Sequence, residues 1–120
     1  MSNEHITDDC LYLYKAHCTS VYDGDTITVT LDLGFGLKME KVKLRLAGID
    51  TPELRQPTLE VGREVRDWLR ERILDKDIYV LTIQDKKGKY GRYLAHIYMT
   101  INDELSINME MLNEGLANPY

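Results

Sequence analysis

Two stretches with alternating side chains flank a short glycine-rich loop, and they constrain the fold of this chain most. Residues 26–33 (TITVTLDL) alternate apolar and polar side chains, and residues 37–47 do the same after Gly34-Phe35-Gly36. A period of two is typical of half-buried strands, because successive side chains point to opposite faces of a sheet. Glycines accept the positive φ angles that tight loops use. The pattern therefore predicts an antiparallel hairpin.

The rest of the chain predicts three more strands and two helices. Apolar residues recur with helical spacing between about residues 59 and 74. Gly62 weakens the first turn there, so the regular helix is expected from about Arg63. A second, short helix is expected to begin near Asn108, a candidate N-cap, and to end at Gly115. Further strands are predicted at residues 10–21, 77–82 and 92–99.

Five short strands with one helix between the third and the fourth indicate a mainly β, α+β domain. The expected architecture is a five-stranded, partly open Greek-key barrel of the OB type, followed by the short second helix. A split α+β sandwich is the alternative, because periodicity does not give strand order. The chain has 120 residues, enough for one core. We expect a polar extension at residues 1–9 and a single domain at residues 10–120.

Charge is distributed unevenly along the chain. The net charge is −5 and the pI is about 5.1. Residues 38–92 hold 14 basic and ten acidic residues, a net charge of +4, whereas the remainder holds one basic and ten acidic residues, a net charge of −9. Such a domain can bind a polyanion locally while it stays acidic overall. A solvated helix face and a basic turn explain most of these charges equally well.

The composition argues against several classes of protein. Cys10 and Cys18 lack C-x-x-C spacing and are expected to be small buried hydrophobes. The three histidines are scattered, which argues against a zinc or transition-metal site. No apolar stretch approaches the roughly 20 residues of a membrane helix. Residues 1–9 lack the features of an export signal. For a complete chain, this predicts a cytoplasmic location and no membrane partner.

Carboxylates gather at the ends of the predicted hairpin strands. Asp23-Gly24-Asp25 precedes one strand and Asp50 follows the other. If the two strands pair, the start of the first and the end of the second lie together, so Asp25 and Asp50 could converge. Carboxylates and carbonyls are the ligands that calcium prefers. Read alone, each of these motifs is more simply a turn signal.

Two arginines are candidates for phosphate binding. Arg45 lies between Leu44 and Leu46, so its side chain leaves the strand on the opposite face. Arg92 begins a predicted strand, close to Lys89. A guanidinium can donate two parallel hydrogen bonds to a phosphate. Taken alone, each arginine is more often an ion-pair partner or a surface residue than a catalytic residue.

Taken together, four motifs resemble the staphylococcal nuclease (thermonuclease) family. They are DGDT (23–26), RLAGIDTPE (45–53), KYGRYLA (89–95) and NEGLA (113–117), and the resemblance spans roughly residues 12–118. It implies an OB-fold, calcium-dependent nuclease that cleaves DNA and RNA with little sequence preference and leaves 3′-phosphate ends. The chain resembles a small variant, without the signal peptide or the last helix of the larger secreted members.

The resemblance also implies a metal site. Asp25 and Asp50 match the carboxylate ligands of calcium, and Thr51 would add its main-chain carbonyl. Asp23 matches an accessory acid near the metal.

The same resemblance implies catalytic and substrate-binding roles. Glu53 matches the residue that orients or deprotonates the attacking water. Arg45 and Arg92 match the arginines that bind the scissile phosphate and stabilise its developing charge. Lys89 and Tyr90 match residues that contact a further phosphate of a nucleotide ligand.

Three functions remain open at this point. The first is an active nuclease acting on DNA or RNA, expected to be a monomer. The second is a non-catalytic OB-fold module that binds single-stranded nucleic acid. The third is an inert structural domain. Binding-only members of the family characteristically lose the arginines or acids, which are all present here. Because a broad-specificity nuclease endangers its host cell, we also expect either a phage, plasmid or mobile-element origin or a tightly controlled role in repair or degradation.

Overall fold

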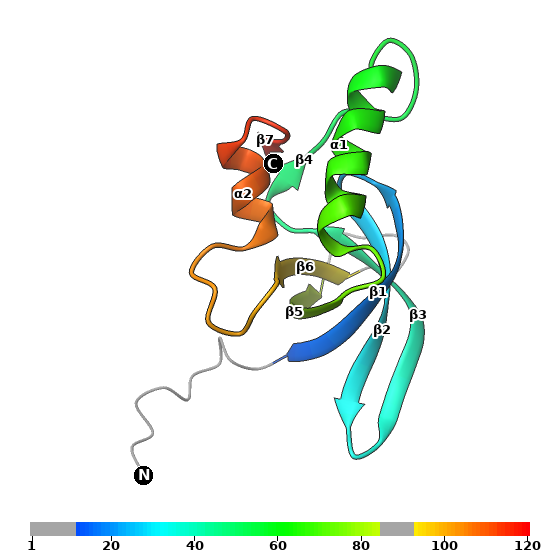
Figure 1. The fold of residues 1–120 in the computed structure, drawn as a ribbon, viewed down its shortest axis with the longest axis vertical. Coiled ribbons are helices and arrows are strands. Elements are labelled where there is room, and N and C mark those ends of the chain that lie inside the picture. The colour runs from blue at the N-terminus through cyan, green and yellow to red at the C-terminus, as the bar shows by residue number, and fades with distance from the viewer. Residues whose placement is uncertain (1–11, 85–92) are drawn as a thin grey trace.

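A closed five-stranded barrel forms the centre of the molecule in the computed structural model, which describes residues 12–84 and 93–120 (Figure 1). The barrel strands are β1 (Leu13–Asp23), β2 (Thr26–Gly34), β3 (Leu37–Leu46), β5 (Asp77–Gln84) and β6 (Tyr93–Tyr98). The other elements are α1 (Leu59–Ile73), α2 (Ile107–Asn113) and a small sheet of β4 (Ile49–Asp50) and β7 (Asn118–Pro119). The predicted OB-type α+β barrel is confirmed, but it is closed rather than partly open, because β3 pairs with β6 and β1 pairs with β5.

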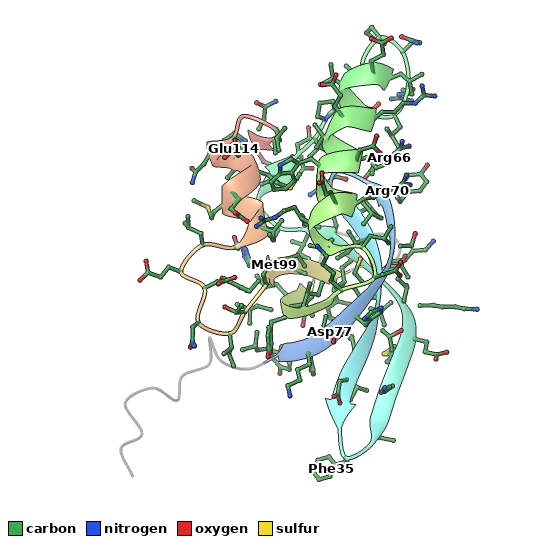
Figure 2. All side chains as sticks on the ribbon, viewed as in Figure 1. Phe35, Arg66, Arg70, Asp77, Met99 and Glu114 are labelled. Carbon is green, nitrogen blue, oxygen red and sulfur yellow. The ribbon has the colours of Figure 1, made fainter. Side chains whose placement is uncertain are left out.

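The strand order around the barrel is β1-β2-β3-β6-β5. All neighbours are antiparallel except β3 and β6, which run parallel and close the barrel by pairing Leu44 with Tyr93 and Leu46 with Ala95. The sandwich alternative is therefore wrong. Beyond the closed part, β2 and β3 continue as a hairpin that carries Phe35 at its exposed tip (Figure 2).

One apolar core joins the barrel to both helices. Leu44 and Leu46 point inward from β3, and α1 adds Leu69 and Ile73. Met111 extends the same core into α2. Helix α1 packs on β1, and α2 packs on β6, so both helices are fixed relative to the strands. Within residues 12–84 and 93–120, no helix is long and apolar enough to cross a membrane.

Both helices begin earlier than the sequence predicts. Helix α1 begins at Leu59 and contains Gly62, because its backbone packs closely on the preceding segment at that point. Ser106, rather than Asn108, is the N-cap of α2, and its side chain accepts a hydrogen bond from the amide of Met109 at 3.1 Å. The expected role of Asn108 as a cap is therefore wrong.

Candidate functional site

An open groove of about 1000 Å³ lies at the end of β2 and β3 where the chain enters and leaves the hairpin. Six residues proposed from the sequence line it: Asp23, Asp25, Arg45, Asp50, Thr51 and Glu53. They come from the β1–β2 turn, the end of β3, β4 and the segment that leads to α1. Three further candidates, Lys89, Tyr90 and Arg92, lie outside the described residues.

The turn between β1 and β2 places Asp25 on the floor of the groove. The Asp25 amide donates a hydrogen bond to Asp23 Oδ1 at 3.0 Å, which closes the turn. A Cβ on Gly24 would stand 2.6 Å from Val65 Cγ1 and 2.8 Å from Thr51 Oγ1. Glycine is therefore needed here for close packing under α1. Asp25 is buried, and Thr26 Oγ1 donates a hydrogen bond to its Oδ1 at 3.2 Å.

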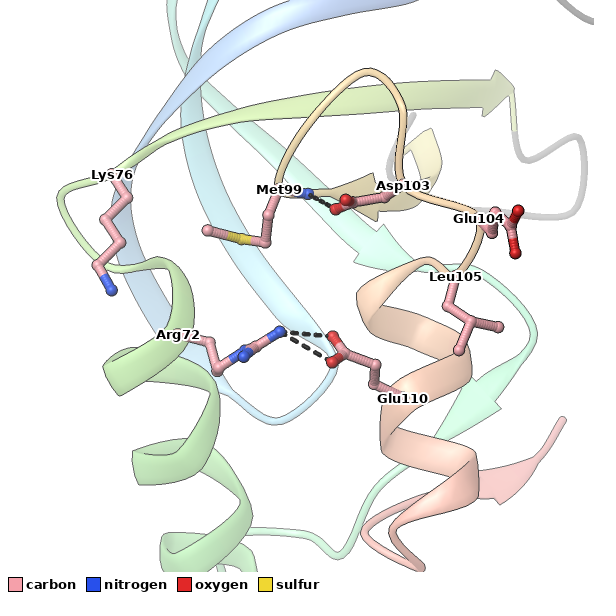
Figure 3. Close-up of a pocket in the computed structure, with 7 residues that line it drawn as sticks. All are labelled: Arg72, Lys76, Met99, Asp103, Glu104, Leu105 and Glu110. Atoms are coloured by element: carbon pink, nitrogen blue, oxygen red, sulfur yellow. Dashed lines mark hydrogen bonds and ion pairs between the residues drawn. The ribbon is translucent and has the colours of Figure 1, made fainter.

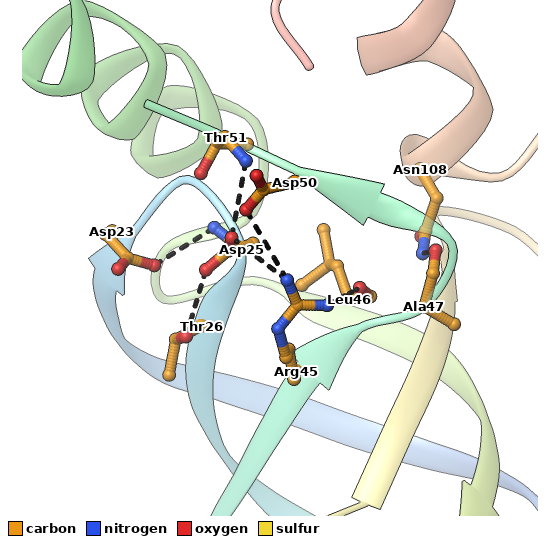
Figure 4. Close-up of polar contacts among 9 residues, drawn as sticks. All are labelled: Asp23, Asp25, Thr26, Arg45, Leu46, Ala47, Asp50, Thr51 and Asn108. Atoms are coloured by element: carbon orange, nitrogen blue, oxygen red, sulfur yellow. Dashed lines mark hydrogen bonds and ion pairs between the residues drawn. The ribbon is translucent and has the colours of Figure 1, made fainter. Parts of the chain in front are cut away.

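Arg45 lies between Asp25, which precedes β2, and Asp50, which follows the end of β3 (Figure 4). Its Nη2 lies 3.6 Å from Asp25 Oδ2 and 3.7 Å from Asp50 Oδ1. Both distances exceed those of a hydrogen bond, so the guanidinium is attracted to both carboxylates without being fixed to either. The Thr51 amide donates to Asp25 Oδ2 at 3.3 Å, which joins β4 to the turn.

The electrostatics of this cluster favour a cation. Burial, together with the neighbouring Asp25 carboxylate, raises the pKa of Asp23 to about 6. Within residues 12–84 and 93–120, no three or more His, Cys, Asp or Glu side chains are arranged to hold a metal ion. Asp25 and Asp50 could supply two oxygen ligands, and a hard cation would complete its shell with carbonyls and water.

The small sheet covers one side of Arg45. Asp50 of β4 pairs with Asn118 of β7, and the Tyr120 amide donates to the carbonyl of Gly48 at 3.1 Å. This places the Tyr120 ring 4.7 Å from Arg45 Cζ, a cation–π contact. The Arg45 side chain is only 15% exposed as a result of these neighbours.

Glu53 lies at the mouth of the groove on the segment that leads to α1. Its carboxylate is 64% exposed and pairs with Arg55 Nε at 2.5 Å. Its backbone is held more firmly, because Thr58 Oγ1 donates to the Glu53 carbonyl at 2.8 Å. A Cβ on Gly62 would approach this carbonyl to 2.8 Å, so α1 packs directly on the Glu53 backbone.

The sequence did not predict the role of Asn108, which binds the segment between β3 and β4. Its Nδ2 donates to the carbonyls of Ala47 and Ala95 at 2.8 and 3.0 Å, and its Oδ1 accepts from the Ile97 amide at 3.1 Å. The bond to Ala47 ties α2 to the residue after β3 (Figure 4), and the other two bonds tie α2 to β6. The available signal was an amide on the apolar side of α2, one turn before Met111.

A second cleft of about 540 Å³ lies between the two helices and does not contain the predicted site residues. Arg72 Nη2 donates to both carboxylate oxygens of Glu110, at 2.9 and 2.7 Å, and joins α1 to α2 there (Figure 3). Asp103 accepts hydrogen bonds from the amides of Met99 and Thr100. These side chains bind other residues of the protein, so we interpret the cleft as part of the structural framework rather than as a ligand site.

Comparison with known proteins identifies similar sequences. The family model described as "Staphylococcal nuclease homologue" matches residues 43–120. The chain is 31% identical over 100 residues to a thermonuclease of Staphylococcus intermedius, covering 81% of this chain and 54% of that protein. It is 32% identical over 100 residues to a thermonuclease of Staphylococcus hyicus, with 81% and 51% covered.

An uncharacterized endonuclease of Escherichia coli is 33% identical over 100 residues, which cover 83% of this chain and 57% of that protein. The chain thus spans about half the length of these relatives.

Proposed function

Because the chain belongs to the staphylococcal nuclease family, we propose that it is a nuclease that hydrolyses phosphodiester bonds of DNA and RNA. The observation that carries the proposal is the shared groove, in which Asp25, Arg45, Asp50 and Glu53 meet from four separate segments. A guanidinium beside carboxylates combines a phosphate-binding group with groups that hold a cation or a water molecule. Substrate preference and the monomeric state expected from the sequence remain predictions, as do the compartment and the origin.

Calcium is the proposed cofactor. Asp25 and Asp50 would hold it, with the Thr51 carbonyl as a third ligand and Asp23 as an accessory acid. The donor set fits, because all its atoms are hard oxygens and because the two carboxylates already attract one positive charge, Arg45, from both sides. When bound, calcium would neutralise and orient the phosphate group.

The protein's own residues would carry the remaining steps. Arg45 donates hydrogen bonds to non-bridging phosphate oxygens, and Arg92 stabilises the charge that develops on the same group. Glu53 orients a water molecule and accepts its proton as the water oxygen attacks phosphorus in line. The bond to the 5′ oxygen breaks, so the phosphate remains on the 3′ end. Lys89 and Tyr90 would hold a neighbouring phosphate.

The test is cleavage of single-stranded DNA, plasmid DNA and RNA by the purified chain, with calcium and then with excess chelator. We expect cleavage with calcium only, and 3′ ends that a polymerase extends only after phosphatase treatment. Glu53→Gln should lower kcat about 10²–10⁴-fold, as expected for loss of a positioned base. Arg45→Lys should also be severely impaired, because a point charge does not replace the guanidinium fork.

Matched substitutions on α1 serve as controls. Glu64→Gln and Arg63→Lys make the same chemical changes at exposed positions outside the groove and should leave the rate unchanged. Near-normal activity of Glu53→Gln would remove the assignment of the base. Retardation of DNA on a gel without cleavage would instead support the single-strand-binding module.

A further inference from the structure

The groove continues beyond the carboxylates along the outer face of β1, β2 and β3, where the proposed reaction uses no residue. This continuation, which we call the strand track, is lined by Ser20, Tyr22, Thr28, Lys41 and Lys43. Its lysines lie on β3 between Arg45 and the free end of the β2–β3 hairpin, and Figure 1 shows the course of this hairpin.

Strand register fixes the strand track relative to Arg45. Arg45 pairs with Thr26, and Lys43 pairs with Thr28, which in turn pairs with Ser20. Lys43 shares the outward side of β3 with Arg45 because the intervening residue points into the core. The two Cα positions are separated by about 6.7 Å, as expected for alternate residues of a strand.

Lys41 continues the row despite an irregularity in β3. Its φ is 58°, and the pairing between β2 and β3 shifts register between Val29 and Leu31, where a bulge interrupts the regular alternation. Its side chain nevertheless lines the groove with that of Lys43. Arg45, Lys43 and Lys41 thus present three cations in sequence along one strand.

The two lysines are available to a ligand. Both are exposed, and neither makes an ion pair within 4 Å with a residue of the described ranges. In a chain with a net charge of −5, cations in a row beside a phosphate-binding groove attract a polyanion locally.

The neighbours of the lysines favour a single strand. The hydroxyls of Ser20 and Thr28 can donate hydrogen bonds to phosphate or sugar oxygens. Tyr22 is 69% exposed and Tyr93 is 41% exposed, and both line the groove. Exposed aromatic rings beside a basic track are typical of surfaces that bind unpaired bases by stacking.

We propose that the strand track is an extended-substrate subsite, in which Lys43 and Lys41 bind the backbone phosphates of a single-stranded polynucleotide next to the scissile bond. The inference builds on the proposed nuclease function, but it concerns binding and can be tested without cleavage. It predicts that affinity grows with strand length until the track is filled.

The experiment measures the fluorescence anisotropy of a labelled oligothymidylate in excess chelator, at several salt concentrations. The variant is Lys41→Gln/Lys43→Gln. The matched control is Lys15→Gln/Lys38→Gln, which removes the same charge from two exposed lysines that line a different cleft. We expect the track variant to lose affinity about fivefold per lysine at 0.1 M salt, and its salt slope to fall by about 0.7 per lysine. The control should keep both values.

Equal weakening of the two double variants would overturn the proposal, because diffuse charge would then explain binding. An unchanged track variant, or a wild type that does not bind, would overturn it as well. Cleavage of a small chromogenic phosphodiester with calcium separates the two proposals. Cleavage by both the wild type and the track variant, without the expected binding difference, leaves the nuclease function and removes the strand track. The binding difference without any cleavage would support the strand track and remove the nuclease function.

Discussion

Asn108 joins α2, β6 and the residue after β3, and its removal should have a large effect on stability. It is 1% exposed and makes three hydrogen bonds, to Ala47, Ala95 and Ile97. Asn108→Ala leaves two buried carbonyls and one buried amide with fewer partners. We expect the free energy of unfolding to fall by about 2–4 kcal/mol. Urea denaturation followed by circular dichroism measures this change.

Asn113→Ala is the matched control, because Asn113 is exposed in the same helix. Its effect should stay within about 0.5 kcal/mol. Similar values for the two variants would mean that the three hydrogen bonds of Asn108 contribute nothing beyond the helix itself.

Single residues differ in how well the sequence predicts them. The convergence of Asp25 and Asp50 was predictable, because a hairpin brings the two ends of its strands together. The contacts of Asn108 were not, because its partners lie up to 61 residues away and its local position suggests a cap. The sequence identifies Lys41 and Lys43 only as basic residues. It does not predict that they line one groove, because this depends on a bulge and on the register of three strands.

At the scale of elements, the position of Glu53 depends on how closely α1 approaches the preceding segment. A Cβ at position 62 would lie 2.8 Å from the Glu53 carbonyl and 2.9 Å from that of Pro52. Gly62→Ala raises helix propensity by about 1 kcal/mol, but the clash with backbone should cost more. We expect a net destabilisation of about 1–2 kcal/mol and, because Glu53 shifts, at least a tenfold lower kcat.

Val61→Ala provides the comparison in the same turn of α1. Val61 is 50% exposed, so the substitution raises helix propensity without a backbone clash. Its stability and kcat should remain near those of the wild type. A Gly62→Ala variant that is more stable than the wild type, with normal kcat, would show that the contact between α1 and Glu53 is loose.

The bounds of an element were predicted well where the local sequence pattern determines them. They were predicted less well where contacts with other elements determine them. Period-two alternation and the glycine loop give the bounds of β2 and β3 to within a residue. The start of α1 was placed too late, because helix propensity at Gly62 was considered without its tertiary contact. The sheet of β4 and β7 has two residues in each strand, too few to produce a periodic signal.

At the scale of the whole molecule, the single core should make the barrel and both helices unfold together. Cys18 reports on this, because it is fully buried in β1 between β2 and β5. Burial raises the pKa of its thiol to about 11, so the reactive thiolate is scarce in the folded protein. A thiol reagent should therefore modify Cys18 only after unfolding.

The measurement uses a Cys10→Ser background, so that Cys18 is the remaining cysteine. If unfolding is global, the labelling rate should follow the unfolding equilibrium. A destabilisation of about 3 kcal/mol by Asn108→Ala should then accelerate labelling about 10²-fold, although Asn108 makes no hydrogen bond to β1. An equal rate in both proteins would mean that β1 opens locally while α2 and β6 stay folded. Strand β1 would then be a cooperative unit separate from α2 and β6, and the groove, which β1 lines with Ser20 and Tyr22, would not share their stability.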